Sequence, residues 1–446
     1  MLDVLISSGA VPGRRPAVVT RQGVSSWREI EALLAEFRQE HALLRRRRVG
    51  LCFEANASGL AALAALAALQ CDAFLIDHRM PLRQSLELCR EIRLGALLTP
   101  DGQGGIAVHE LAGQQPGNGE ASVTILTSGS TGKPKAARHT WRSLSRPVRS
   151  GRLGEAPCWL LAYRPDLYAG LQVILQCLLD GGTLAVPGPD GDPSAIAELM
   201  LKAGVRFASA TPSYWRKLLL FADGSLLGRM NLAQATLGGE VVDQQLLDAM
   251  KRAFPEARLA HIFATTELGR CFSVSDGRAG FPAAYLQEPL PDGVELRIEN
   301  GELLARSPNS MQGYDECSSE PSEAEDWVRT GDLVAVKGDR VHFLGRKTDI
   351  INVGGNKVHP IEVERVVRSV PGVSDVRVFA KPSSIAGQLV ACEVVPGRGE
   401  DDEALQKRIV EACRKQLAPH QWPRIIRSTG KMALSGAQKT LRSAPG

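Results

Sequence analysis

The 446-residue sequence lacks the patterns that mark several common classes of protein. None of its nine cysteines belongs to a CxxC pair, so neither a zinc knuckle nor a disulfide framework is supported, and buried free thiols are expected. No apolar run reaches the roughly 20 residues of a membrane span. The most apolar run begins at Ala57 and predicts a buried, alanine-rich helix. The first residues, MLDVLISSGAVPGRRP, have no basic segment before their apolar residues and so do not form a secretory signal. We therefore expect a cytoplasmic location and no membrane span.

A strong excess of one charge is also missing. The chain has 53 lysines and arginines against 49 acidic residues, a formal charge of +4. This balance suits anionic small molecules and argues against a dedicated nucleic-acid binder. The basic cluster Arg45–Arg48 follows an amphipathic segment, and we interpret it as a cationic last helical turn. No nucleic-acid partner is expected.

Low-complexity linkers and internal repeats are absent from the sequence, which alternates short apolar strands with helical patterns, as in RVGLCFE followed by ASGLAALAALAAL. This alternation predicts an α/β fold with a largely parallel sheet. From about Pro282 the pattern changes to antiparallel hairpins. After Gly345 a helix, two strands and a second helix predict a compact α+β unit. We expect a large N-terminal body of α/β subdomains with a β-rich portion (1–345) and a small, mobile α+β C-terminal domain (346–446).

The most informative segment is TSGSTGKPK (127–135), which crowds hydroxyls, glycines and lysines behind the strand SVTIL. Backbone amides near glycines, hydroxyl groups and lysine charge together favour a bound phosphate. A P-loop needs glycine five residues before its Gly-Lys pair and Ser or Thr directly after it. Here Thr127 and Pro134 occupy those places, so the segment is not a P-loop.

Five segments in order resemble the motifs of the acyl-adenylate-forming ligases, the family of acyl- and aryl-CoA synthetases, luciferases and peptide-synthetase adenylation domains. They are TSGSTGKPK, FATTELG (263–269), RTGDLV (329–334), GRKTDIINVGGNKVHPIEVE (345–364) and LSGAQKTLR (434–442). The resemblance covers nearly the whole chain. It departs from the family pattern at Ala264, where glycine is usual, at Thr348, where Asp or Lys is usual, and at Ala437-Gln438, where Asn-Gly is commoner.

The resemblance implies two half-reactions. A carboxylate attacks the α-phosphate of ATP, which releases pyrophosphate and leaves an acyl-AMP, and a thiol then takes the acyl group. ATP, Mg²⁺ and CoA, or the phosphopantetheine of a carrier protein, are the implied cofactors and co-substrates. The implied phosphate contacts are Thr127, Ser128, Gly129, Ser130, Thr131, Gly132 and Lys135.

The remaining motifs imply one role each. Glu267 would ligate Mg²⁺, and Thr266 would contact the α-phosphate. Phe263 would lie against adenine, with the segment Gly238, Gly239 and Glu240 on the other side of the base.

The last three motifs imply the ribose site, the catalytic lysine and the moving parts. Asp332 would accept hydrogen bonds from the ribose hydroxyls, and Arg346 would bind the ribose or phosphate side. Lys439 would neutralise charge in the adenylation transition state. The C-terminal domain would then rotate about Thr348 and open a thiol tunnel walled by Gly354 and Gly355.

The acid is predicted from the substrate pocket, which is expected to include Tyr168, Gly170, Gly238, Ala264 and Thr265. In amino-acid-activating members an Asp at the place of Tyr168 binds the α-ammonium group. A phenol supplies no fixed negative charge, so an α-amino acid is disfavoured, although Asp166 lies only two residues away. We expect an aryl or fatty acid.

The acceptor thiol and the reaction class leave alternatives open. NVGGNKVHPIEVE resembles the CoA-ligase form of the glycine loop, and Lys347, Lys357 and Arg365 offer charge to nucleotide phosphates. Enzymes that load acyl carrier proteins share much of this loop and are the second hypothesis. A luciferase-like oxygenase would share every motif, whereas a non-catalytic relative would have lost Glu267, Asp332 or Lys439, all of which are present.

Overall fold

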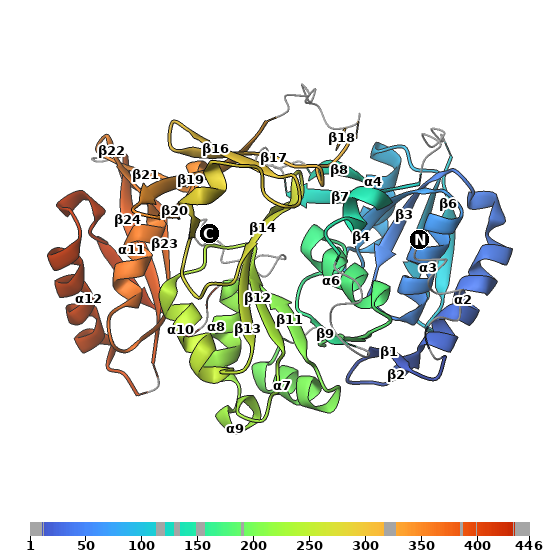
Figure 1. The fold of residues 1–446 in the computed structure, drawn as a ribbon, viewed down its shortest axis with the longest axis horizontal. Coiled ribbons are helices and arrows are strands. Elements are labelled where there is room, and N and C mark those ends of the chain that lie inside the picture. The colour runs from blue at the N-terminus through green and yellow to red at the C-terminus, as the bar shows by residue number, and fades with distance from the viewer. Residues whose placement is uncertain are drawn as a thin grey trace.

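The computed structural model describes residues 11, 13–112, 121–128, 134–148, 157–188, 191–315, 327–383, 387–397, 399–430 and 432. These residues form four sheets flanked by helices (Figure 1). Both predicted features, the parallel sheets of the body and the α+β unit near the C-terminus, are present. Among the described residues, no helix is both long and apolar enough to cross a membrane.

A seven-stranded sheet lies near the N-terminus, with the strand order β18-β8-β7-β4-β3-β5-β6. Its central strands are parallel, and β6, β8 and β18 are antiparallel to their neighbours. The strands are β3 (Arg48–Phe53), β4 (Asp72–Asp77), β5 (Ala96–Pro100), β6 (Ile106–Glu110), β7 (Ser122–Ser128), β8 (Pro134–Thr140) and β18 (Gly313–Tyr314). The helices in this part are α2 (Trp27–Glu40), η1 (Ala42–Leu44), α3 (Ala57–Ala68), α4 (Leu82–Glu91) and α5 (Trp141–Ser145).

An eight-stranded sheet follows, with the order β14-β13-β12-β11-β9-β10-β1-β2, parallel except at its two ends. Its strands are β1 (Pro16–Val19), β2 (Val24–Ser26), β9 (Cys158–Leu161), β10 (Thr183–Ala185), β11 (Phe207–Ala210), β12 (Gln234–Gly238), β13 (Arg258–Thr265) and β14 (Gly269–Val274). Its helices are α6 (Tyr168–Leu179), α7 (Pro193–Lys202), α8 (Pro212–Phe221), α9 (Gly224–Leu227) and α10 (Gln244–Ala253). Side-chain caps from Asp192, Thr211 and Asp243 fix where α7, α8 and α10 begin.

The largest core cluster combines apolar side chains of both sheets with those of α2, α3 and α6. Helix α3 packs against α2 and against the seven-stranded sheet, so it must be apolar all round and narrow. This explains why α3 is alanine-rich and buried from Ala57 to Leu66, as predicted. Helices α7, α8 and α10 cover the other face of the eight-stranded sheet. The eight described cysteines are buried and free, which confirms that expectation for them.

The β-rich portion forms a five-stranded antiparallel sheet with the order β15-β20-β19-β17-β16. Its elements are β15 (Phe281–Pro282), η2 (Ala283–Leu286), β16 (Glu295–Glu299), β17 (Glu302–Arg306), β19 (Val328–Lys337) and β20 (Arg340–Arg346). Asn300 and Gly301 have φ values of 51° and 78° at the β16–β17 turn, as a two-residue hairpin requires. This sheet bridges the two large halves of the molecule in Figure 1.

The C-terminal unit has its own sheet and its own apolar core, which begins at Ile351. Its elements are η3 (Lys347–Asp349), β21 (Ile351–Val353), β22 (Asn356–Val358), α11 (Pro360–Arg368), β23 (Val373–Ser383), β24 (Gly387–Pro396), α12 (Asp402–Gln416), η4 (Pro419–Gln421) and β25 (Ile425–Ser428). It lies beside α10 in Figure 1, and the Arg368 guanidinium of α11 contacts the Asp243 carboxylate at 3.2 Å. The domain border at residues 345 and 346 stays a prediction.

The interpretation of Arg45–Arg48 as a last helical turn was wrong. Helix α2 ends at Glu40, and Arg48 is the first residue of β3. Its side chain is 5% exposed, lies 2.5 Å from the Asp315 carboxylate and 3.7 Å from that of Asp72, and covers the Phe74 ring at 4.8 Å. Arg48 therefore compensates two carboxylates beneath the seven-stranded sheet.

Replacing Arg48 with methionine is expected to lower the free energy of unfolding by about 3–5 kcal/mol, because Asp72 and Asp315 then lose their shared cation in a buried place. Urea unfolding would measure this. The exposed Arg45→Met is the control and should change stability by no more than about 0.5 kcal/mol. A loss in Arg48→Met as small as that of the control would show that the buried pair contributes no net stability.

Candidate active site

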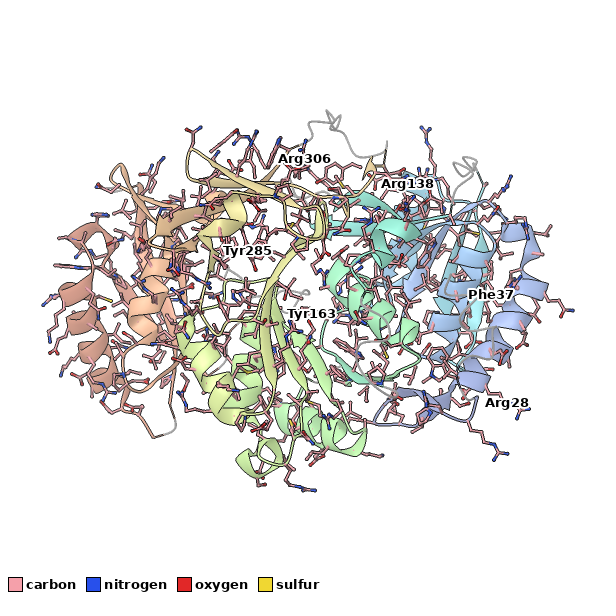
Figure 2. The ribbon with its side chains drawn as sticks, viewed as in Figure 1. Arg28, Phe37, Arg138, Tyr163, Tyr285 and Arg306 are labelled. Carbon is pink, nitrogen blue, oxygen red and sulfur yellow. The ribbon has the colours of Figure 1, made fainter. Side chains whose placement is uncertain are left out.

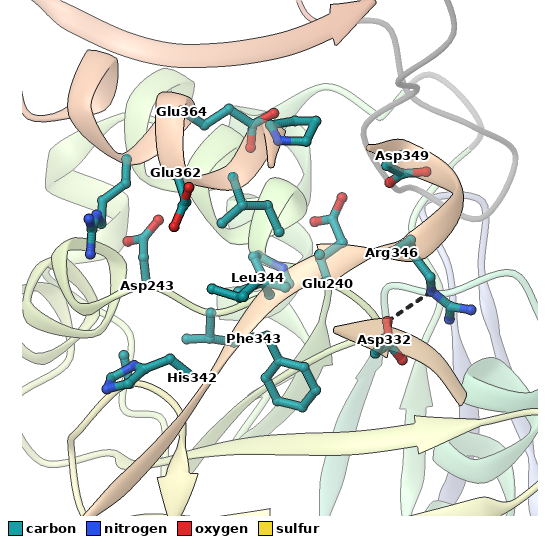
Figure 3. Close-up of a pocket in the computed structure, with 18 of the residues that line it drawn as sticks. Glu240, Asp243, Asp332, His342, Phe343, Leu344, Arg346, Asp349, Glu362 and Glu364 are labelled. Atoms are coloured by element: carbon teal, nitrogen blue, oxygen red, sulfur yellow. Dashed lines mark ion pairs between the residues drawn. The ribbon is translucent and has the colours of Figure 1, made fainter. Parts of the chain in front are cut away.

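One cavity of about 990 Å³ brings together residues from distant parts of the chain, between the body and the C-terminal unit. Seven residues predicted from the motifs line it, namely Gly239, Glu240, Phe263, Ala264, Asp332, Arg346 and Thr348. The loop after β12 and the end of β13 supply four of them because ligands bind at the carboxyl edge of parallel strands. Strands β19 and β20 supply Asp332 and Arg346 (Figure 3).

Asp332 and Arg346 are paired by the register of β19 and β20. The Arg346 Nε atom lies 2.9 Å from Asp332 Oδ1, and its Nη1 donates to the Thr330 carbonyl at 3.1 Å. The Asp332 side chain is 12% exposed, whereas that of Arg346 is 50% exposed. A carboxylate held in this way presents fixed acceptor atoms to the cavity.

Phe263 supplies a flat apolar surface on the cavity wall. Its ring packs against Phe343 at 5.2 Å and Phe272 at 5.3 Å between centroids. Across the cavity lining, Gly239 has a φ of 83°, and the Glu240 carboxylate accepts the Ser213 amide at the start of α8. These contacts hold the Phe263 ring and the Gly239-Glu240 segment in place on the cavity wall.

Glu267 lies on a separate turn between β13 and β14. The Tyr314 hydroxyl donates to Glu267 Oε1 at 3.2 Å, and Lys135 Nζ lies 5.3 Å from the centre of the Tyr314 ring. Glu267, Thr266 and Lys135 do not line the cavity described above. The described residues contain no cluster of three or more His, Cys, Asp or Glu side chains that could hold a metal.

Part of the predicted site lies outside the described residues. Gly129, Ser130, Thr131, Gly132 and Lys439 belong to this group, as does the side chain of Ser128. The strands on either side of the phosphate loop are described. Thr127 at the end of β7 donates its hydroxyl proton to the Lys135 carbonyl of β8 at 3.3 Å.

The predicted acid pocket is only partly brought together. Of its residues, Ala264 lines the cavity, whereas Tyr168, Gly170, Gly238 and Thr265 do not. Tyr168 is buried, which raises the pKa of its phenol, and its Oη accepts the Arg270 amide at 3.2 Å. The assignment of Tyr168 to the pocket stays a prediction.

The two glycines and Thr265 have local structural contacts. A Cβ atom on Gly170 would lie 1.9 Å from the Arg164 carbonyl oxygen, so only glycine fits where α6 begins. The Gly238 carbonyl accepts from the Tyr163 hydroxyl at 3.3 Å, and Tyr163 is labelled near the middle of Figure 2. Thr265 Oγ1 accepts the Leu268 amide at 3.1 Å. Each of these contacts fixes the local backbone. The assignment of Gly170, Gly238 and Thr265 to an acid pocket stays a prediction.

Asp166, the possible partner of an α-ammonium group, is already paired. The Arg164 guanidinium binds it through two nitrogens, with Nε 3.0 Å from Oδ1, and also contacts the Asp77 carboxylate at 3.2 Å. The Asp166 side chain is only 5% exposed. Its charge is therefore compensated within the protein.

The residues predicted to form the hinge and the glycine loop follow β20, and of these Thr348 lines the cavity. Thr348, in the short η3 turn, donates to Asp349 Oδ1 at 3.2 Å. Gly354 and Gly355, with φ values of 55° and 86°, form the exposed turn of the β21–β22 hairpin. They do not line the cavity in this arrangement.

Charged side chains that sequence reasoning missed line the cavity where α8, α10 and α11 meet. Asp243 contacts Arg216 at 2.5 Å and Arg368 at 3.2 Å. Burial raises the pKa of the Asp243 carboxyl, but the two guanidiniums and the Leu246 amide lower it more, so the pKa lies below its usual value. Arg216 comes four residues into α8, and no motif marks it. Arg368 on α11 is the second cation that contacts Asp243, and this juxtaposition is visible only in the folded chain.

Two models of one enzyme family match the chain. The model described as AMP-binding enzyme matches residues 102–315, and the one described as AMP-binding enzyme C-terminal domain matches residues 362–439. The fold and the cavity thus define an adenylate-forming ligase. The chain belongs to the AMP-binding enzyme family, the acyl-adenylate-forming ligases.

The relatives are CoA ligases. The chain is 26% identical to a 2-succinylbenzoate–CoA ligase of Listeria monocytogenes serotype 4b over an alignment of 343 residues, which covers 72% of this chain and 69% of the relative. It is 26% identical to a feruloyl-CoA synthase of an Amycolatopsis species over 350 residues, 72% of this chain and 69% of the relative.

Solved structures share the fold over nearly the whole chain. The anthranilate CoA ligase AuaEII in complex with anthranoyl-AMP has a TM-score of 0.80 at 17% identity, covering 98% of this chain and 95% of that one. The o-succinylbenzoate CoA synthetase of Bacillus subtilis with its acyl-adenylate has a TM-score of 0.74 at 20% identity, covering 99% and 97%.

Proposed function

We propose that the protein activates a carboxylic acid with ATP to an acyl-AMP and transfers the acyl group to the thiol of CoA. The observation that carries this proposal is the cavity in which Phe263, Asp332 and Arg346 meet, since they come from three strands and offer an aromatic face, a held carboxylate and a cation. These are the groups that an adenosine phosphate needs. Membership in the AMP-binding enzymes supports the same activity.

The described residues that would bind ATP lie in two places. In the cavity, Phe263 would hold the adenine, Asp332 the ribose hydroxyls and Arg346 the ribose or phosphate side. At the turn after β13, Thr266 and Glu267 would face the phosphates, and Lys135 would contact them from β8. The acid would bind between these places, with its carboxylate directed to the α-phosphate, where Lys439 neutralises developing charge.

Mg²⁺ fits Glu267. Magnesium in nucleotide sites is bound by one or two carboxylates together with substrate phosphates, so a single partly buried carboxylate is sufficient. Tyr314 orients this carboxylate by its hydrogen bond to Oε1. When bound, the ion would supply positive charge to the leaving pyrophosphate.

An aryl acid is the substrate class favoured. The sequence relatives are named for succinylbenzoate and ferulate, both aromatic acids. An α-amino acid is disfavoured because Tyr168 carries no charge and Asp166 is paired with Arg164. A fatty acid remains the second class.

CoA is favoured as the acceptor because both relatives are named as CoA-dependent. Lys337, Arg340 and Arg365 lie around His342 on the cavity lining, and burial together with these cations lowers the pKa of His342. Arg340 is paired with the Asp276 carboxylate, so Lys337 and Arg365 are the members of this group that would meet the phosphates of CoA. The phosphopantetheine arm of an acyl carrier protein is the alternative.

The proposal predicts acid-dependent exchange of labelled pyrophosphate into ATP. A panel of aromatic, aliphatic and α-amino acids should give exchange with aromatic acids first, and none without Mg²⁺. Supplying CoA should then yield an acyl-CoA, whereas a phosphopantetheinylated carrier protein should react poorly. Lack of exchange with every acid would overturn the proposal, and thioester formed only on the carrier would replace CoA as the acceptor.

A further inference from the structure

The turn that carries Glu267 is held from several sides by groups far away in the sequence. Within the turn, Thr265 Oγ1 accepts the Leu268 amide. From outside, the Met311 amide donates to the Glu267 carbonyl at 2.8 Å, and Tyr168 Oη accepts the Arg270 amide at 3.2 Å. A further contact to the turn is made at the carbonyl oxygen of Thr266.

His139 makes that contact. Its Nε2 atom lies 2.7 Å from the Thr266 carbonyl oxygen, and its Nδ1 atom lies 3.2 Å from Ser143 Oγ at the start of α5. The imidazole is fully buried, and its ring lies 5.5 Å from that of Tyr168. The partners on both nitrogens fix the ring in one orientation.

The protonation state follows from these partners. Burial lowers the pKa of His139, while the Thr266 carbonyl and Glu267 oppose the shift without reversing it. The ring is therefore neutral at pH 7 and has one N–H group. A carbonyl oxygen can only accept, so Nε2 donates to Thr266.

Strand β8 connects this bond to the phosphate loop. His139 and Lys135 are four residues apart on β8, so both side chains point to the same face of the strand. β18 pairs with β8 through Tyr314 and Ala137, and Tyr314 donates to Glu267 Oε1. Strand β8, which follows the phosphate loop, is therefore connected to the Glu267 turn in two ways. His139 contacts the backbone of the turn, and Tyr314 of the neighbouring β18 contacts the Glu267 carboxylate.

We propose that His139 is a positioning residue, which holds the Thr266 carbonyl so that the turn presents Glu267 to metal-bound phosphates. This proposal rests on the proposed function of Glu267. Outer partners of metal ligands typically change metal affinity or activity about 10–100-fold when they are removed, and we expect an effect of this size.

The test uses three replacements of His139 in the full chain. His139→Leu removes the donor. His139→Gln places an amide N–H near the former Nε2, whereas His139→Asn reaches only the former Nδ1 position. The leucine and asparagine variants should lower the rate of pyrophosphate exchange about 10–100-fold and require more Mg²⁺, and the glutamine variant should restore most of the rate. His109→Leu, which removes the imidazole on β6 that contacts Thr99 on β5, is the control and should keep the wild-type rate.

A binding measurement separates this proposal from the proposed function. Calorimetric titration of ATP with and without Mg²⁺ should show a metal-dependent gain in affinity that His139→Leu loses and His139→Gln keeps, while the affinity for adenosine, which has no phosphate, stays constant. This binding result does not depend on whether any acid supports pyrophosphate exchange. Equal Mg²⁺ dependence in all variants would overturn the proposal. So would a parallel loss of adenosine affinity and thermal stability that His139→Gln does not rescue, since that would show a purely structural histidine.

Discussion

Replacing Lys439 with alanine is expected to slow acyl-AMP formation about 10²–10³-fold, because one charge contact to the transition state is lost. Thioester formation from supplied acyl-AMP should stay largely intact. In the proposed mechanism the lysine would stabilise charge only while the α-phosphate is under attack, and the C-terminal domain would carry it away for the second step. Pyrophosphate release measures the first step, and thioester yield from synthetic acyl-adenylate measures the second.

The exposed Lys415→Ala, in the last turn of α12 on the same domain, is the matched control and should change neither step. If Lys439→Ala slowed both steps equally, the lysine would be supporting the structure, and the rotation of the domain would be the wrong model for this chain.

A bulky residue at Gly355 should have the opposite effect. In this arrangement no heavy atom lies within 4 Å of a Cβ placed there, so Gly355→Trp meets no clash and adenylation should proceed. The indole would block the thiol path once the domain has turned. Because the φ of 86° strains any side chain, Gly355→Asn is the control for strain. Equal loss of thioester formation in both variants would point to backbone strain and not to a blocked path.

The sequence predicted those features that depend on local pattern. The N-G turn at Asn300 needs only two neighbouring residues, and the burial of α3 follows from its composition. The motif residues Phe263, Asp332 and Arg346 do meet in one cavity. Phe263 lies near the carboxyl end of β13, whereas Asp332 and Arg346 are opposite each other in the antiparallel pair of β19 and β20.

Contacts between distant segments escaped prediction. The spacing placed Tyr168 at the start of a helix, but the partner of its hydroxyl, the Arg270 amide, is 102 residues away. His139 and Thr266 are separated by 127 residues, and only the position four residues after Lys135 could have drawn attention to the histidine. Arg48 follows other arginines and an amphipathic segment, which suggested a cationic last helical turn, whereas its counter-charges come from β4 and from Asp315.

Replacing Asp332 with asparagine is expected to lower kcat/KM for ATP about 10–100-fold, because hydrogen bonds to a charged group are worth about 1.5–3 kcal/mol. The shape of the side chain is kept and stability should change little, since the Arg346 partner is half exposed and stays hydrated. Asp339→Asn is the matched control. It also removes a carboxylate from an arginine pair, with Arg278, but on an exposed turn.

Ribose analogues of ATP decide whether Asp332 acts on the hydroxyls. With the wild-type protein, 2′-deoxy-ATP and 3′-deoxy-ATP should each lose part of the kcat/KM of ATP. In Asp332→Asn these losses should largely disappear, because the carboxylate that accepts hydrogen bonds from the hydroxyls is gone. The effect of the substitution and the effect of the missing hydroxyl are then no longer additive. If the variant discriminated against the deoxy analogues as strongly as the wild type, while its melting temperature fell, Asp332 would be a turn-forming residue of the TGD segment. The carboxylate pair with Arg346 would then stabilise the β19–β20 hairpin and not the nucleotide.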